Sequence, residues 1–208
     1  MPSRDPSPYV PIPGTVPHPR ALFIDRWGTL MHAPERGYPL SFQEVEFAPG
    51  AVDALFRATQ AGWRVYLIGN EQAVWQGHVT LEAWQAMESA LLAHLAEHGA
   101  RIDRSYVCLD DPVHGVKGRR KDSVYRLPNT GAFYHAAHSD RVELRKSWVI
   151  GDSTLELVAG WRAGVRLAAV RSGLGLSDCT YEVTPEIEAP DLASVLHELL
   201  ELENALHP

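Results

Sequence analysis

The sequence has little of what secreted, membrane-embedded or nucleic-acid-binding proteins need. It has only two cysteines, Cys108 and Cys179, which lie far apart, so it lacks the disulfide framework of small secreted domains. No apolar run approaches the ~20 residues that cross a bilayer, and the N-terminus has no apolar signal segment. These absences predict a cytoplasmic protein that does not enter a membrane.

Positive charge is also scarce, because the formal net charge is −7 and the pI is about 5.8. Binding to nucleic acid or to anionic lipid needs a concentrated basic face, so we expect neither partner. The one dense basic cluster is Lys117-Gly118-Arg119-Arg120-Lys121. It is either a solvated loop or a local site for an anion.

Proline is concentrated at the N-terminus, where residues 1–20 hold seven of the fifteen prolines. Proline lacks the N–H that helices and sheets require, so residues 1–20 are predicted to form an extended tail. The tail is either a loosely packed leader or a binding segment for a protein partner. Residues 21–208 are predicted to form one domain.

Short apolar runs alternate with helical patterns through that domain. The runs at 21–24, 63–68, 102–108, 147–150 and 167–170 are typical of buried parallel strands. Helices are predicted from 50 to 62, from Thr80 to Gly99, from 132 to 138, up to Ala163, and from 191 to 206. This order predicts an α/β fold, Rossmann-like, with a doubly wound parallel sheet, helices on both faces and no large separate cap domain.

Polar residues follow three of the predicted strands directly: Asp25, Asn70 and Asp152. In open parallel sheets, ligands bind at the carboxyl ends of the strands. We therefore expect these three residues to lie at one site.

Asp25-Arg26-Trp27-Gly28-Thr29-Leu30 resembles the first motif of the haloacid dehalogenase superfamily, Asp-x-Asp-Gly-Thr. Three further segments resemble the subgroup of heptose bisphosphate and histidinol phosphatases: FAPGAVDALFRATQAGWRVYLIGNEQ at 47–72, HLAEHGARIDRSYVC at 94–108 and VIGDSTLELVAGWRAGV at 149–165. The resemblance covers roughly residues 20 to 200. It implies that Asp25 is a nucleophile that forms an aspartyl phosphate, and that Asp25, Asp152 and Glu156 offer oxygen ligands to Mg²⁺.

The same resemblance marks several losses. Trp27 replaces the Asp that protonates the leaving group and activates water, and an indole can only donate one hydrogen bond. Gly69 replaces a phosphate-binding hydroxyl, and Leu127 stands at the position of the phosphate-binding Lys. Asn70 and Arg126 match substrate-binding positions, and Lys121 is a second candidate for the missing cation.

The subgroup's zinc loop is also incomplete, because Cys108 is kept while Asp110, Ser123 and Tyr125 occupy other ligand positions. Zinc sites of this kind need Cys and His ligands, so we expect no Zn²⁺.

These substitutions favour a catalytically impaired or inactive phosphatase with a binding, regulatory or assembly role. One alternative is an active Mg²⁺-dependent phosphatase acting on a sugar phosphate, histidinol phosphate or similar small ligand. Another is a hydrolase like the haloacid dehalogenases, which carry an aromatic residue where this chain has Trp27.

Overall fold

A computed structural model describes residues 18–206 and contains one six-stranded parallel sheet in the order β3-β2-β1-β4-β5-β6. The proposed tail at 1–20 lies outside the described residues, apart from its last three. The strands are β1 (Ala21–Asp25), β2 (Arg64–Asn70), β3 (Arg104–Cys108), β4 (Trp148–Gly151), β5 (Arg166–Val170) and β6 (Ile187–Ala189).

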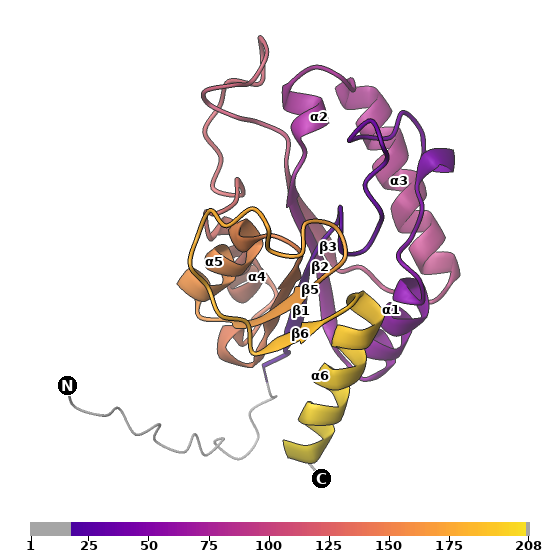
Figure 1. Ribbon diagram of the computed structural model, residues 1–208, viewed down its shortest axis with the longest axis vertical. Helices are drawn as coiled ribbons and strands as arrows, with labels where there is room; N and C mark the ends of the chain where they lie inside the picture. The colour runs from indigo at the N-terminus through magenta and orange to yellow at the C-terminus, as the bar shows by residue number, and fades with distance from the viewer. Residues whose placement is uncertain (1–17, 207–208) are drawn as a thin grey trace, which may run out of the picture.

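Helices cover both faces of this sheet (Figure 1). They are α1 (Ala51–Gln60), α2 (Gln72–Trp75), α3 (Leu81–Glu97), α4 (Gly131–Ser139), α5 (Thr154–Ala163) and α6 (Leu192–Leu206), with short 3-10 turns at Phe42–Glu44 and Leu144–Lys146. Helices α1, α3 and α6 pack on one face, and α4 and α5 pack on the other. The predicted fold class is therefore confirmed.

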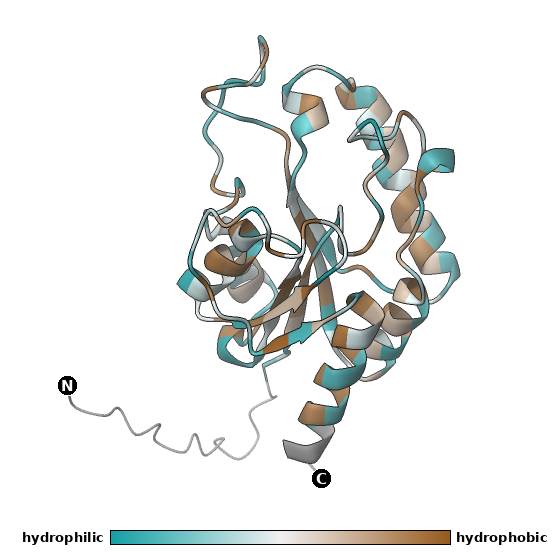
Figure 2. Ribbon diagram, viewed as in Figure 1, coloured by the Kyte–Doolittle hydropathy of each residue, from teal (hydrophilic) through white to brown (hydrophobic). Residues whose placement is uncertain are grey.

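Side-chain alternation along the strands divides the core into two layers. In β1, Leu22 and Ile24 face the layer of α1, α3 and α6, whereas Ala21 and Phe23 face the layer of α4 and α5. This alternation follows from the two-residue repeat of a strand, and both faces are apolar because both are covered. Figure 2 shows the apolar strands between helices whose polar residues face outward.

The helix boundaries follow local signals. Thr80 caps α3, because its side-chain oxygen accepts a hydrogen bond from the Ala83 N–H at 3.2 Å. Gly164 ends α5 with φ of +79°, a conformation that favours glycine. Both signals were predicted from the sequence.

The strand order reverses direction between β1 and β4, which are neighbours in the sheet. The ends of these two strands flank the crevice in which ligands of doubly wound sheets bind. Asp25 ends β1, and Asp152 follows β4 directly. Within the part of the chain that the structure describes, no helix is long and apolar enough to cross a membrane.

Candidate active site

A cavity of about 590 Å³ opens at the carboxyl ends of β1, β2 and β4. It brings together Asp25, Asn70, Asp152 and Glu156, four residues singled out from the sequence. Its lining comprises Asp25, Arg26, Trp27, Gly28, Ala33, Gly37, Gly69, Asn70, Glu71, Gln72, Ala73, Val107, Asp152, Ser153, Leu155, Glu156, Gly173 and Leu174.

Asp25 is 7% exposed at the end of the central strand. Burial raises the pKa of its carboxyl group well above the usual value, and repulsion from Glu156 and Asp152 raises it further. The hydrogen bond from the Arg26 N–H acts in the opposite direction. A cation at this position would favour the ionised form of Asp25.

Asp152 is held between two glycine turns. A Cβ added at Gly28 or at Gly173 would lie 2.1 Å from Asp152 Oδ2, so neither position has room for a side chain. The Leu174 N–H donates to the same oxygen at 2.7 Å, and the Ser172 hydroxyl joins the two turns by donating to the Gly28 carbonyl. Backbone atoms therefore fix the Asp152 carboxylate.

Burial also raises the pKa values of the two acids that follow β4. The pKa of Asp152 rises to about 6, although the hydrogen bond from Leu174 opposes this shift. The pKa of Glu156 rises to about 7, and the hydroxyl of Ser153, which donates to Glu156, opposes that shift.

The chemistry of these donors fits Mg²⁺. The carboxylates of Asp152 and Glu156 raise the pKa of Asp25, and Asp152 raises the pKa of Glu156, which is the electrostatic condition that a cation relieves. Among residues 18–206, however, no group of three or more Asp, Glu, His or Cys side chains is arranged so that it could hold a metal ion by itself. Mg²⁺ commonly uses only one or two carboxylates and keeps several waters, so a closed cage is not required.

Trp27 lines the cavity without filling it. Its indole N–H donates to Glu71 Oε2 at 3.2 Å, and its side chain is half-buried against the core. This hydrogen bond turns the indole toward Glu71.

Gly69 approaches the carboxylate of Asp25 closely. A Cβ added there would lie 3.2 Å from Asp25 Oδ1, and the φ of Gly69 is +149°, where a side chain is strained. The missing hydroxyl is therefore accompanied by a backbone conformation that favours glycine.

Asn70 and Leu127 form a different contact from the one that the family motif implies. The Asn70 side chain donates to the Leu127 carbonyl at 3.1 Å and accepts from the Leu127 N–H at 2.9 Å. The Leu127 side chain is 2% exposed and packs in the core beside Phe23 and Phe133. Asn70 lines the cavity, but its amide is engaged in holding the chain at Leu127.

The structure does not bring Arg126 or Lys121 to the cavity lining. The guanidinium of Arg126 donates to Asp111 Oδ2 at 3.0 and 2.6 Å. Lys121 is exposed. Neither side chain occupies the place of the missing Lys in this structure, because the first is paired within the loop and the second faces solvent.

The segment between β3 and α4 is held by Asp111. One of its oxygens accepts the Val113 and His114 N–H groups at 2.9 and 2.7 Å, and the other accepts from Arg126. These bonds lower the pKa of Asp111 to about 2, the one from His114 contributing most.

Two residues at positions that the family resemblance assigns to zinc ligands make other contacts. The thiol of Cys108 lies 3.2 Å from the Asp110 carbonyl, and the Tyr125 hydroxyl lies 2.6 Å from His135 Nδ1.

Several residues that line the cavity were not singled out from the sequence, among them Glu71, Gly173 and Leu174. Glu71 is 4% exposed. It directly follows the strand-end residue Asn70, and this position was the sequence signal that could have placed it at the cavity. Gly173 and Leu174 follow β5. The Ser172-Gly173 turn after an apolar strand was a weaker sequence signal for their position.

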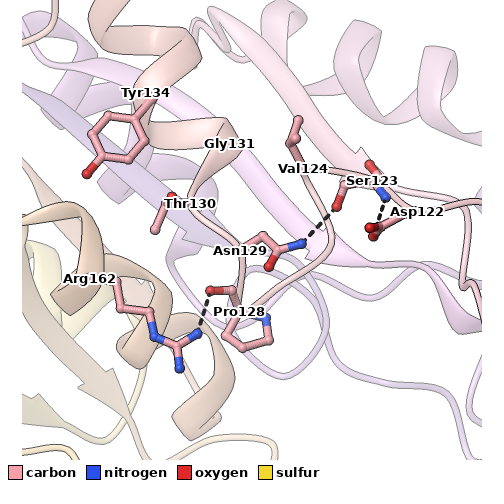
Figure 3. Close-up of a pocket in the computed structure, with 9 residues that line it drawn as sticks. All are labelled: Asp122, Ser123, Val124, Pro128, Asn129, Thr130, Gly131, Tyr134 and Arg162. Carbon is pink, nitrogen blue, oxygen red and sulfur yellow. Dashed lines mark hydrogen bonds between the residues drawn. The ribbon is translucent and has the colours of Figure 1, made fainter.

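A second hollow of about 720 Å³ lies beside α4 and α5 (Figure 3). Arg162 donates to the Pro128 carbonyl at 3.2 Å, and Asn129 donates to the Ser123 carbonyl at 2.9 Å. Its only charged lining residues are Asp122 and Arg162, so it lacks the carboxylate cluster of the first cavity. Its lining is Asp122, Ser123, Val124, Pro128, Asn129, Thr130, Gly131, Tyr134 and Arg162.

Known proteins with similar sequences are phosphatases. The chain is 28% identical over 184 residues to a D-glycero-beta-D-manno-heptose-1,7-bisphosphate 7-phosphatase of Pseudomonas putida, covering 87% of this chain and 99% of that one. It is 27% identical over 188 residues to an enzyme of the same name from Escherichia coli, covering 89% and 93%. No protein-family model matches the chain.

Solved structures agree with this relationship. The D,D-heptose 1,7-bisphosphate phosphatase from B. bronchiseptica, complexed with magnesium and phosphate, superposes with a TM-score of 0.76 at 26% identity, covering 88% of this chain and 99% of that one. A HAD-like phosphatase from Mesorhizobium loti gives 0.74 at 28% identity, covering 94% and 91%. Together with the sheet order and the Asp25–Asp152 site, these findings show that the chain is similar in sequence and fold to the heptose bisphosphate phosphatases of the haloacid dehalogenase superfamily.

Proposed function

We propose that this protein is a Mg²⁺-dependent phosphatase that hydrolyses a small phosphorylated metabolite through an aspartyl phosphate on Asp25. The observation that carries the proposal is the open cavity of about 590 Å³, with Asp25 on its floor and Asp152 and Glu156 beside it. Trp27 and Leu127 would have to fill this space in a pure scaffold. One lines it, and the other packs in the core.

In the first step, an oxygen of Asp25 attacks phosphorus and the ester P–O bond breaks. The leaving oxygen takes its proton from water, because Trp27 has no acidic proton to give. In the second step, water attacks the aspartyl phosphate, the bond between phosphorus and Asp25 breaks, and inorganic phosphate leaves. A bound Mg²⁺, held by Asp25 and Asp152 with Glu156 nearby, would supply positive charge between these carboxylates and the phosphate.

The absence of an acid and base at position 27 predicts a slow enzyme. General acid and base catalysis contributes roughly 10² to 10⁴ in rate. The second step suffers most, since water must be activated without a neighbouring carboxylate at that position. We therefore expect the aspartyl phosphate to be long-lived.

The alternative is a catalytically inactive phosphatase fold used for binding, regulation or assembly. The observation that favours it is the side chain of Leu127, which packs into the core where the family's Lys would supply a cation. A scaffold of this kind would bind a phosphorylated ligand and release no phosphate.

Phosphate release from a panel of sugar, amino alcohol and nucleotide monophosphates would test the proposal, with and without Mg²⁺. We expect slow, Mg²⁺-dependent release that Asp25→Asn abolishes. Asp53→Asn is the matched control, because Asp53 is an exposed residue of α1 outside the cavity. Absence of release from every substrate would contradict the proposal and favour the inactive alternative.

Intact-mass measurement after treatment with acetyl phosphate would examine the first step alone. A Mg²⁺-dependent gain of one phosphoryl group in the wild type, absent from Asp25→Asn, is the expected result.

A further inference from the structure

The cavity has no uncommitted cation for a second phosphate group. Its charged lining residues are the carboxylates Asp25, Asp152 and Glu156, together with Glu71 and Arg26. In the proposed function, a bound Mg²⁺ would partly offset the charge of the first three and of one phosphoryl group. Any further anionic group of the substrate then meets only Glu71 and Arg26.

Arg26 is ion-paired with two carboxylates, although its Nε and Nη1 make no hydrogen bond within the described residues. Its side chain is 3% exposed, and its guanidinium lies 3.1 Å from Glu88 and 3.5 Å from Glu71. It also lies 5.8 Å from the ring centre of Trp27 and of Trp84, so it is packed under α3. Arg26, Glu71 and Glu88 together carry one positive and two negative charges, so the net charge of these three side chains is negative.

The cations of the loop between β3 and α4 are also committed or distant. Arg126 bonds to Asp111, Arg119 lies 3.3 Å from Asp110, and Arg120 donates to the Gly115 carbonyl at 2.8 Å. Lys117 and Lys121 are exposed and do not line the cavity.

The remaining lining is largely apolar and small. It consists mainly of Trp27, Ala33, Gly37, Ala73, Val107, Leu155 and Leu174. Such a surface favours an uncharged group, because a charge placed against it loses hydration without gaining a partner.

Resting on the proposed function, we infer that the cavity selects phosphate esters with a single phosphate and an uncharged, partly apolar remainder, and that Glu71 disfavours a second phosphate. This preference differs from that implied by the printed names of the relatives, which are bisphosphate phosphatases. Glu71 is a specificity-determining residue, since its carboxylate lines the cavity beside the indole of Trp27.

Binding of fructose 6-phosphate and fructose 1,6-bisphosphate tests the inference, because they differ by one phosphate. We would measure both by titration calorimetry with Mg²⁺ in Asp25→Asn, which blocks turnover. We expect the monophosphate to bind tighter by on the order of tenfold, as for one unfavourable charge pair in a partly shielded site. Equal or tighter binding of the bisphosphate, or no binding of either sugar at millimolar concentration, would overturn the inference.

Adding Glu71→Gln keeps the size of the side chain and removes its charge, so the discrimination should shrink severalfold. Glu198→Gln makes the same change on the exposed surface of α6 and should leave the ratio unchanged. An unchanged ratio in Glu71→Gln would refute the role of Glu71.

Salt provides a second measurement that needs no added variant. Raising the ionic strength from 0.05 to 0.5 M should reduce the discrimination, because repulsion between charges is screened. A ratio of affinities that does not depend on salt would count against charge as its cause.

Wild-type turnover separates the inferred selectivity from the proposed phosphatase activity. Turnover that favours the bisphosphate would refute the inferred selectivity but support the proposed phosphatase activity. Selective binding of the monophosphate without turnover would support the selectivity but refute the phosphatase activity.

Discussion

Replacing Gly28 by alanine should displace the Asp152 carboxylate and lower the free energy of unfolding. The part of this loss that comes from the clash can be separated from the part that comes from the backbone conformation. Gly28 has φ of +88°, and an added Cβ would lie 2.1 Å from Asp152 Oδ2. Gly62 has nearly the same φ, +82°, but an added Cβ would meet nothing within 4 Å. Gly62→Ala is therefore a matched control that isolates the clash.

The magnitudes follow from the contacts. An alanine with positive φ costs about 1 to 2 kcal/mol, and both variants carry this cost. Gly28→Ala adds about 1 to 3 kcal/mol of overpacking, because Asp152 Oδ2 must move by more than an ångström. That movement also disturbs the hydrogen bond from Leu174. We therefore expect Gly28→Ala to lose about 2 to 4 kcal/mol more than Gly62→Ala.

Urea unfolding followed by tryptophan fluorescence at pH 7.5, without Mg²⁺, would measure this difference. A second readout is the stabilisation gained on adding Mg²⁺, which should be reduced in Gly28→Ala and retained in Gly62→Ala, because a bound ligand stabilises the folded state in proportion to its affinity. Equal losses in the two variants would refute the close packing of Asp152 between the glycine turns.

Three further predictions concern the acids of the site and the loop. Without Mg²⁺, the free energy of unfolding should fall by on the order of 3 kcal/mol from pH 5 to pH 7.5. The reason is that the raised pKa values of Asp152 and Glu156 make the folded state hold protons that the unfolded chain releases. Urea titrations in EDTA that show a rise in stability over this range would contradict the prediction. Metal-free Asp25→Asn should unfold at higher urea concentration than the wild type, because it removes a buried carboxylate repelled by two others; an unchanged or lower midpoint would argue against that repulsion. Asp111→Asn should speed limited proteolysis within residues 109–130 and leave global unfolding nearly unchanged, because Arg126 loses a charged partner; protection equal to the wild type, detected by mass spectrometry, would show that this contact does not hold the loop.

The sequence predicts the parts of the site that depend on strand ends. Asp25 and Asp152 each follow a continuous apolar strand, and parallel strands place their carboxyl ends at one edge. The direction of a long side chain depends on its neighbours instead. Arg126 could not be placed from the sequence, because its partner Asp111 lies fifteen residues away in a loop without a repeating pattern.

Two elements of the fold were missed for a related reason. Strand β6 has only three residues, and Pro185 and Pro190 lie close to its ends. Helix α2 has four residues. Elements this short contain only about one apolar repeat, so hydrophobic periodicity cannot identify them.

The burial of Arg26 makes substitutions at Arg26 and at Glu88 depend on each other, although the two residues lie far apart in the sequence. The backbone of Arg26 adjoins Asp25, whereas its side chain pairs with Glu88 in α3 and with Glu71. Loss of Arg26 alone would leave Glu88 and Glu71 without their cation in the interior, which is more costly than losing Arg26 and Glu88 together. Evolution along this lineage is therefore expected to exchange Arg26 and Glu88 together, through a narrow set of mutational routes, even though substrate need not touch either side chain.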